Sequence, residues 1–150
     1  MTFIAKKMKD FKIFLVMLII PAAFSCKKAP AISAVQDSDL SLRIMKIKNS
    51  PDDKEASNYA VRLSPDKRLL AAKDNKLATD LWYRMDSCFY LQTGNQKIYA
   101  TIIQPIANGI TGTFEYYVSF ETTEVSAGKP ELVYADRYIN HKKYKLSLPE

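Results

Sequence analysis

The sequence predicts a mainly β protein, an antiparallel β-sandwich or small open barrel with at most one short helix. Apolar and polar residues alternate with a period of two in several short segments rich in aromatic and β-branched residues. Turn-forming residues separate these segments at short intervals, as in all-β domains. The clearest segment is residues 114–121 (FEYYVSFE), in which one face of a strand would carry Phe114, Tyr116, Val118 and Phe120.

Two strands are expected before residue 64. Apolar residues alternate with polar ones in residues 40–48, and a shift of phase predicts a β-bulge near Ile44. Residues 49–57 (NSPDDKEAS) are rich in turn formers and predict a loop. Alternation resumes at residues 59–63, which predicts the second strand.

One helix is expected to begin at Ser64 and Pro65, because serine is a good N-cap and proline suits the first helical position. It would continue through residues 69–72 and end near Asp74. Residues 77–91 fit helical and strand spacing equally well. Their many aromatic residues favour extended structure from about Leu81.

The second half of the chain predicts further strands. Residues 93–95 (TGN) indicate a tight turn in a hairpin formed by residues 88–92 and 97–104. After a loop at residues 105–113 and the strand at 114–121, two short strands are expected at 132–134 and 144–148, joined by polar residues 136–141. The residues expected to pack on the apolar face of the 114–121 strand are Ile98, Ala100 and Ile102.

The first 25 residues have the plan of a secretory signal peptide. Four lysines precede an unbroken apolar run from Ile13 to Ile20, and Pro21 and small residues follow it. This run of eight residues is far shorter than the roughly 20 that span a bilayer. A cleaved export signal is therefore favoured over a transmembrane helix.

Residues 22–26 (AAFSC) resemble the lipobox of bacterial lipoprotein precursors, in which small or aliphatic residues precede a cysteine. The resemblance covers only about the first 28 residues. It implies cleavage between Ser25 and Cys26 and lipidation of the Cys26 sulfur. Lys27, in place of an aspartate after the cysteine, implies the outer membrane. The alternative is an ordinary signal peptide with a cysteine near its end.

We therefore expect a signal peptide at residues 1–25, a lipidated cysteine and flexible tether at 26–39, and one β-sandwich domain at 40–150. The domain would be anchored to the outer membrane through lipid on Cys26 and would face the periplasm. The sequence leaves display at the cell surface open.

The charge of the chain does not indicate a nucleic-acid partner. Removing residues 1–25, which hold four lysines and one aspartate, lowers the net charge from +6 to +3. The remaining basic residues are spread along the chain, whereas nucleic-acid-binding proteins concentrate them in a stripe. Basic pairs predict solvated surface, with contact to anionic lipid headgroups as the alternative. These pairs are Lys27-Lys28, Lys67-Arg68 and Lys142-Lys143.

No catalytic or cofactor-binding motif is present in the sequence, so we expect no cofactor, no bound metal and no enzymatic activity. Its single histidine, His141, cannot build a multi-histidine metal site. The acidic cluster at residues 52–55 lacks the spacing of a calcium loop. Glu115 and Glu121 would lie about 20 Å apart on one strand, too far for a catalytic carboxylate pair.

Cys88 lies beside Phe89 and Tyr90, which predicts a small buried apolar residue. With Cys26 carrying lipid, no intramolecular disulfide is available to it. A disulfide between chains and a reactive thiol are the alternatives.

Nine tyrosines are a high number for this length, and most are expected to be half-buried with the hydroxyl at the surface. An alternative is an aromatic patch that binds a partner. The residues proposed for this patch are Tyr99, Tyr117, Tyr134 and Tyr138.

Two functional hypotheses follow. The first is a lipid-anchored protein-interaction or structural module that docks on another envelope protein, for example in an envelope-spanning assembly such as a secretion system. The second is a lipid-anchored carrier or receptor that holds a small molecule, glycan or lipid in a cleft of the sandwich.

Overall fold

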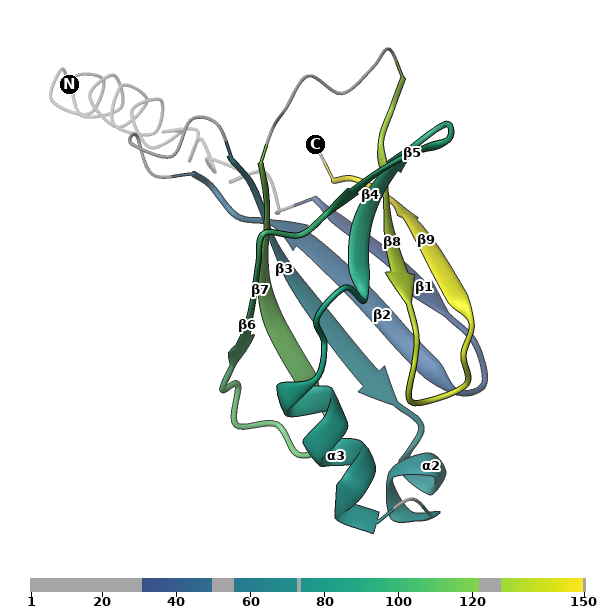
Figure 1. The fold of residues 1–150 in the computed structure, drawn as a ribbon. Coiled ribbons are helices and arrows are strands. Elements are labelled where there is room, and N and C mark those ends of the chain that lie inside the picture. Colours follow the sequence, from purple (N-terminus) through teal and green to yellow (C-terminus); the bar gives the residue numbers. More distant parts are fainter. Residues whose placement is uncertain (1–30, 50–55, 73, 122–127, 150) are drawn as a thin grey trace, which may run out of the picture.

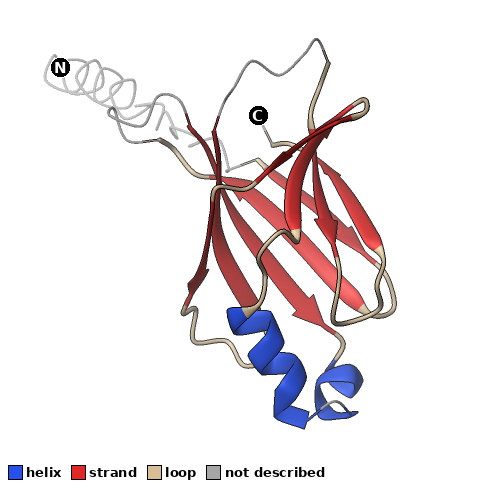
Figure 2. Ribbon diagram, in the orientation of Figure 1, coloured by secondary structure: helices blue, strands red, loops and turns tan. Residues whose placement is uncertain are grey.

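The computed structural model describes residues 31–49, 56–72, 74–121 and 128–149. The predicted signal peptide and the cleavage and lipidation residues, Ser25 and Cys26, lie outside these ranges. Strands dominate the described part, together with two short helices (Figures 1 and 2). In chain order the elements are β1 (Ile32–Gln36), β2 (Leu40–Lys46), β3 (Ala56–Pro65), α2 (Lys67–Ala72), α3 (Asp74–Tyr83), β4 (Phe89–Thr93), β5 (Gln96–Tyr99), β6 (Ile102–Ile106), β7 (Phe114–Glu121), β8 (Glu131–Ala135) and β9 (Lys143–Ser147).

The strands form two antiparallel sheets. One sheet has the strand order β1-β2-β3-β7-β6, and the other has the order β5-β4-β8-β9. The predicted β-sandwich-like class is therefore confirmed, with two short helices in place of at most one. Alternating residues cause this arrangement, because each strand turns one face toward the opposite sheet.

Different elements lie at the two ends of the sandwich (Figure 1). The entry end holds the start of β1, where the described chain begins, together with the ends of β2, β7 and β9 and the starts of β3 and β8. The helical end holds α2, α3 and the connections β1–β2 and β8–β9.

Aromatic rings fill much of the space between the sheets. The ring centroid of Phe89 in β4 lies 5.8 Å from that of Tyr116 in β7 and 5.2 Å from that of Tyr134 in β8. Such tilted contacts stabilise a core beyond the burial of apolar area alone. The predicted apolar face of β7 is confirmed, since it buries Phe114, Tyr116, Val118 and Phe120.

The first helix begins later than the sequence predicts. Ser64 and Pro65 are the last residues of β3, where Ser64 pairs with Ser41 of β2. Asp66 caps α2 instead, because its Oδ1 accepts the amide of Arg68 at 2.8 Å. Strand pairing outweighs the local preference of Ser64 and Pro65 for a helix start.

The second helix, α3, corrects the prediction of extended structure from Leu81. Leu77 and Leu81 are buried four residues apart and share the face that packs on the core. The buried hydroxyl of Tyr116 donates a hydrogen bond to the Leu81 carbonyl. Leu81 belongs to the last turn of α3, so no residue of the helix lies far enough along the chain to donate its amide to the Leu81 carbonyl. The sequence pattern of this segment fits a helix and a strand equally well, and packing against β7 decides in favour of the helix.

β1 lies inside residues 26–39, so the prediction of a flexible tether is wrong for this segment. It pairs with β2 along its whole length, and Ile32 lies opposite Met45. Because β1 is an edge strand with exposed or half-buried side chains, it has no apolar alternation to reveal it. The bulge predicted near Ile44 is also wrong, since β2 pairs residue for residue with β3.

Residues 97–104, predicted as one strand, form two strands in different sheets. At the corner between them, the Ala100 amide donates to a β4 carbonyl at 3.2 Å and the Thr101 amide to a β7 carbonyl at 2.9 Å. Because the chain changes sheet here, the residues of β6 that face the core are not the ones that a single continuous strand would turn toward it. Ile102, expected in the core, is 48% exposed, and Ile103 packs against the core in its place.

The Tyr116 hydroxyl gives a direct test of how α3 is held. We expect Tyr116→Phe to lower the free energy of unfolding by about 1 kcal/mol and to speed amide exchange in α3. The matched control is Tyr117→Phe, because this residue lies on the outward face of the same strand. Urea unfolding and hydrogen exchange measure the two effects. Equal losses in both variants would contradict the role of this hydroxyl.

Candidate functional site

The four tyrosines proposed as one binding patch lie in different parts of the molecule. Tyr134 is 0% exposed in the core, so its place in a surface patch is wrong. It follows Leu132 on β8 by two residues and therefore shares its inward face. Tyr99 is half exposed on the edge strand β5, Tyr117 faces outward on β7, and Tyr138 lies in the β8–β9 connection.

An aromatic surface forms instead where the end of α3 meets β6. Tyr83, the last residue of α3, is 78% exposed. Trp82 is half-buried, and its ring packs edge-on against Phe114 at 5.2 Å between centroids. We call this region the α3–β6 surface and define it by Trp82, Tyr83, Ile103, Pro105 and Ile110.

Two cavities lie on either side of Trp82 in this surface. One, of about 170 Å³, lies between Trp82, Tyr83 and the β6 residues Ile103 and Pro105. The other, of about 360 Å³, lies between Trp82 and the β6–β7 connection, where Ile110 is half exposed. Trp82 therefore forms a wall of both cavities.

A glycine shapes the second cavity. Gly112 has a φ of 76°, which favours glycine over residues with a side chain. A Cβ at this position would lie 3.2 Å from the Leu70 side chain of α2. The close approach keeps the β6–β7 connection against the helices and holds Ile110 beside Trp82.

The sequence carried a signal for the α3–β6 surface that the strand prediction concealed. On a helix, Leu77 and Leu81 form the inward stripe. Trp82 lies about 100° round from Leu81, at the margin of this stripe, and Tyr83 lies about 200° round, on the opposite face. Adjacent aromatic residues beside an apolar stripe indicate exposed aromatic area. Both residue types also favour a strand, which conceals this signal.

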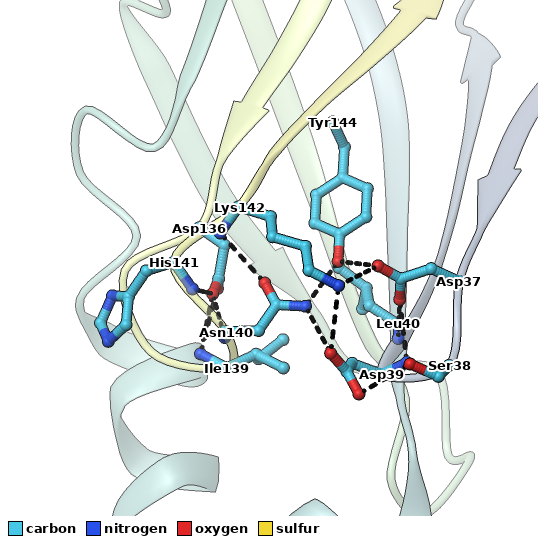
Figure 3. A network of polar contacts seen from close by, with 10 residues as sticks. All are labelled: Asp37, Ser38, Asp39, Leu40, Asp136, Ile139, Asn140, His141, Lys142 and Tyr144. Carbon is cyan, nitrogen blue, oxygen red and sulfur yellow. Dashed lines mark hydrogen bonds and ion pairs between the residues drawn. The ribbon is translucent and has the colours of Figure 1, made fainter.

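A buried carboxylate shapes the β8–β9 connection (Figure 3). Asp136 is 5% exposed and accepts the Tyr134 hydroxyl at 2.7 Å. It also accepts the backbone amides of Ile139, Asn140 and His141 at 2.9, 2.6 and 2.8 Å. His141 has a φ of 61°, a left-handed backbone conformation in the turn that leads into β9. All of these hydrogen-bond donors belong to β8 or to the connection that follows it, so the Asp136 side chain stabilises the fold of this loop.

A second group of contacts joins this loop to the β1–β2 connection (Figure 3). The Lys142 ammonium lies 2.9 Å from Asp37 and 3.3 Å from Asp39. Asn140 donates to Asp39 at 3.0 Å, and the Tyr144 hydroxyl donates to Asp37 at 2.9 Å. These bonds connect β1 and β9, the edge strands of the two sheets. Lys142 is therefore an intramolecular cross-link and not simply part of a solvated basic pair.

The pKa of Asp37 is held well below its ordinary value of 3.8, first by hydrogen bonding to Lys142 and then by the backbone amide of Asp39. The pKa of Asp39 is lowered as well, first by its hydrogen bond from Asn140. Both carboxylates are thus stabilised as anions and have partners within the chain. The network supports a structural role and provides no general base.

Two of the remaining candidates for chemistry, Cys88 and Glu115, have structural roles. Burial raises the pKa of the Cys88 thiol to about 11, and the residue is fully buried, which supports core packing over a reactive thiol or a disulfide between chains. Glu115 pairs with Arg62 at 2.8 Å. His141 is exposed and lines a cavity of about 380 Å³ with Asp80 and Arg137.

The described ranges hold no cluster of metal-ligating side chains and no membrane-spanning helix. There, no group of three or more histidine, cysteine or acidic residues is placed to hold a metal ion. The acidic cluster at residues 52–55 lies outside them. No described helix is long and apolar enough to cross a membrane.

No protein-family model, curated protein or solved structure matches this chain.

The network at Asp37 predicts a pH dependence of stability. Because the folded pKa lies below the ordinary 3.8, the charged carboxylate stabilises the fold above that pH, and this contribution is lost as the pH falls further. We expect Asp37→Asn to cost about 1 kcal/mol at pH 7 and progressively less between pH 4 and pH 2.

Urea unfolding of both proteins across this pH range measures the difference. Asp86→Asn, an exposed acid on the α3–β4 connection, is the control and should show little change at any pH. A cost of Asp37→Asn that stays constant down to pH 2 would show that the carboxylate charge does not stabilise the fold.

Proposed function

We propose that this protein is a non-catalytic, lipid-anchored envelope protein that binds another protein through the α3–β6 surface. The observation that carries the proposal is the 78% exposure of Tyr83 beside the half-buried Trp82. A solvated tyrosine and an adjoining tryptophan are the residue types that most often dominate the binding energy of protein interfaces.

The shape of the surface supports a protein partner. Trp82 is fixed from behind by Phe114, so binding would cost little side-chain ordering. The two flanking cavities offer recesses for side chains of a partner. Ile103, Pro105 and Ile110 supply apolar area around the two aromatic residues, and their contacts would exclude water from the centre.

The interior of the sandwich gives less support to the carrier hypothesis. The space between the sheets is occupied by large buried rings, including Phe89, Tyr116, Tyr134 and Tyr144. A ligand placed among them would have to displace close-packed side chains. The interaction module is therefore the function that the described residues support best.

The lipid anchor would orient this surface. Only residues 27–31 separate Cys26 from the start of β1, so an extended link reaches about 20 Å. The ten residues of β3 run from the entry end to the helical end, a length of about 33 Å. An anchor at Cys26 would therefore hold the entry end near the membrane and present the α3–β6 surface to the periplasm.

Site-specific photocrosslinking tests the proposed partner surface. We expect Tyr83→p-benzoylphenylalanine, expressed in the native host, to give a discrete protein adduct that mass spectrometry can identify. The matched control is Tyr117→p-benzoylphenylalanine on the outward face of β7. With the partner purified, Tyr83→Ala should raise Kd about 30-fold, equivalent to about 2 kcal/mol. The same adducts at both positions, or an unchanged Kd, would contradict the proposal.

The anchor has an independent test. Cys26→Ser should abolish metabolic labelling by an alkyne fatty acid and release the protein from the membrane fraction, because the sulfur that carries the lipid is lost. Cys88→Ser is the control and should keep both label and membrane association. Membrane association that survives Cys26→Ser unchanged would contradict the anchor.

A further inference from the structure

The outer face of the five-stranded sheet carries a row of mostly apolar residues. Residues that lie directly opposite each other on antiparallel strands share one face of the sheet. One such row crosses all five strands, which lie in the order β1-β2-β3-β7-β6 (Figure 1), and consists of Ile32, Met45, Ala60, Tyr117 and Gln104. The outer face of an antiparallel sheet is normally polar, so this row departs from the usual pattern.

Apolar side chains of this face are open to solvent at both edges of the sheet. Ile32 on β1 is 56% exposed, and Ile102 on β6, two residues before Gln104 and on the same face, is 48% exposed. Met45, between the two edges, is half-buried. The outer face of the other sheet follows the usual pattern, because β9 presents two exposed lysines there, Lys143 and Lys145.

The next row of the five-stranded sheet carries an unbalanced positive charge. Arg43 on β2 lies directly opposite Arg62 on β3, and like charges in this arrangement repel each other. Arg62 is balanced by Glu115 on its other side, at 2.8 Å. Arg43 is exposed, and within the described ranges no ion pair or hydrogen bond reaches its guanidinium group. The row therefore lacks a negative charge beside Arg43.

Glu115 keeps one carboxylate oxygen for a further partner. Nε and Nη2 of Arg62 both donate to its Oε2, at 3.0 and 2.8 Å, and Nδ2 of Asn108 donates to the same oxygen at 3.4 Å. In the part of the chain that the structure describes, no donor reaches Oε1, and this atom is accessible to solvent. The row thus offers a cation on β2 and an acceptor on β7, one strand to either side of β3.

We propose that two copies of this chain pack through these outer faces, around a two-fold axis that runs along β3. Such an axis turns β2 of one copy toward β7 of the other and leaves each row opposite itself. Arg43 would then pair with Oε1 of Glu115 of the second copy, twice in the dimer. Met45 would contact Tyr117 of the second copy. Ala60 lies on the axis, where its small side chain allows the two sheets to approach closely.

The self-complementarity of the face favours a second copy over an unrelated protein. Arg43 and Glu115 lie on strands equally far from β3, as do Met45 and Tyr117, and an isologous interface requires this symmetry. Five strands of 5 to 10 residues give roughly 600 Å² of sheet face per copy. The total of roughly 1,200 Å² is the lower limit of standard interfaces, which suits a reversible dimer. This interface uses neither the α3–β6 surface nor Cys26, so it does not depend on the proposed function.

Crosslinking at the axis tests the dimer. The full chain carrying Cys26→Ser is expressed in the native host, which leaves the buried Cys88 as its remaining cysteine. Ala60→Cys is added, and the cells are treated with a short bismaleimide. Packed sheets lie about 10 Å apart, so the two thiols on the axis would be within reach of one reagent molecule. We expect a crosslinked dimer in which mass spectrometry identifies this chain alone.

The matched control is Ala34→Cys in the same chain, an exposed alanine of the same face on β1. Because β1 lies two strands from the axis, the two thiols would be about 20 Å apart laterally and out of reach. We expect Ala60→Cys to give at least about fivefold more dimer than Ala34→Cys, although Ala34 is the more exposed residue. Equal yields at the two positions, or no dimer with Ala60→Cys, would overturn the proposal.

Reversing the charge of Arg43 separates the interface from the fold. Arg43→Glu would place acids opposite each other across the interface, so we expect about tenfold less dimer with Ala60→Cys. The same change removes the repulsion between Arg43 and Arg62 within one copy, so urea unfolding should show no loss of stability. Adding Glu115→Arg keeps an acid beside Arg62 and restores opposite charges across the interface, so the dimer should return.

The charge variants can also contradict the dimer. A dimer yield that Arg43→Glu leaves unchanged would show that this row does not lie in the contact. Loss without recovery in the folded double variant would show that Arg43 and Glu115 do not pair between copies. An Ala60→Cys adduct that contains a different protein would assign the face to another partner.

Discussion

Two buried tyrosine hydroxyls determine how the helical end of this sandwich is built. A phenol taken out of water must keep a hydrogen-bond partner, since an unpaired buried hydroxyl costs about as much as the bond contributes or more. Tyr116 meets this requirement at the Leu81 carbonyl of α3, and Tyr134 meets it at the Asp136 carboxylate. Both rings lie in the aromatic core with Phe89, so the core and the helical end are one connected structure.

The surfaces of the molecule follow from these two bonds. Fixing Leu81 sets the rotation of α3, and that rotation leaves Tyr83 in solvent. Fixing Asp136 sets the β8–β9 connection, from which Asn140 and Lys142 reach the β1–β2 connection and join the two sheets. The helical end thus holds both the exposed Tyr83 and the hydrogen-bond network around Asp136.

The strength of the sequence pattern decides which elements could be predicted. β7 and the hairpin of β4 and β5 are found because apolar alternation or turn chemistry is local and unambiguous. The edge strand β1 buries few side chains and leaves no such pattern. The change of sheet at Thr101 is invisible for a different reason, because residues on both sides favour extended structure equally. The helix α3 could not be predicted, because Trp82 and Tyr83 suit a strand as well as a helix.

The sequence by itself determined the mainly β class, the inward face of β7 and the lack of any recognised catalytic motif. These depend on residue type and on a spacing of two, which are local properties of the chain. Only the tertiary structure decided that residues 74–83 are helical, that Tyr134 is buried and that Asp37 lies beside Lys142. Each of these depends on contacts between residues distant in sequence. Such contacts form only when two sheets close on one core, so no local pattern records them.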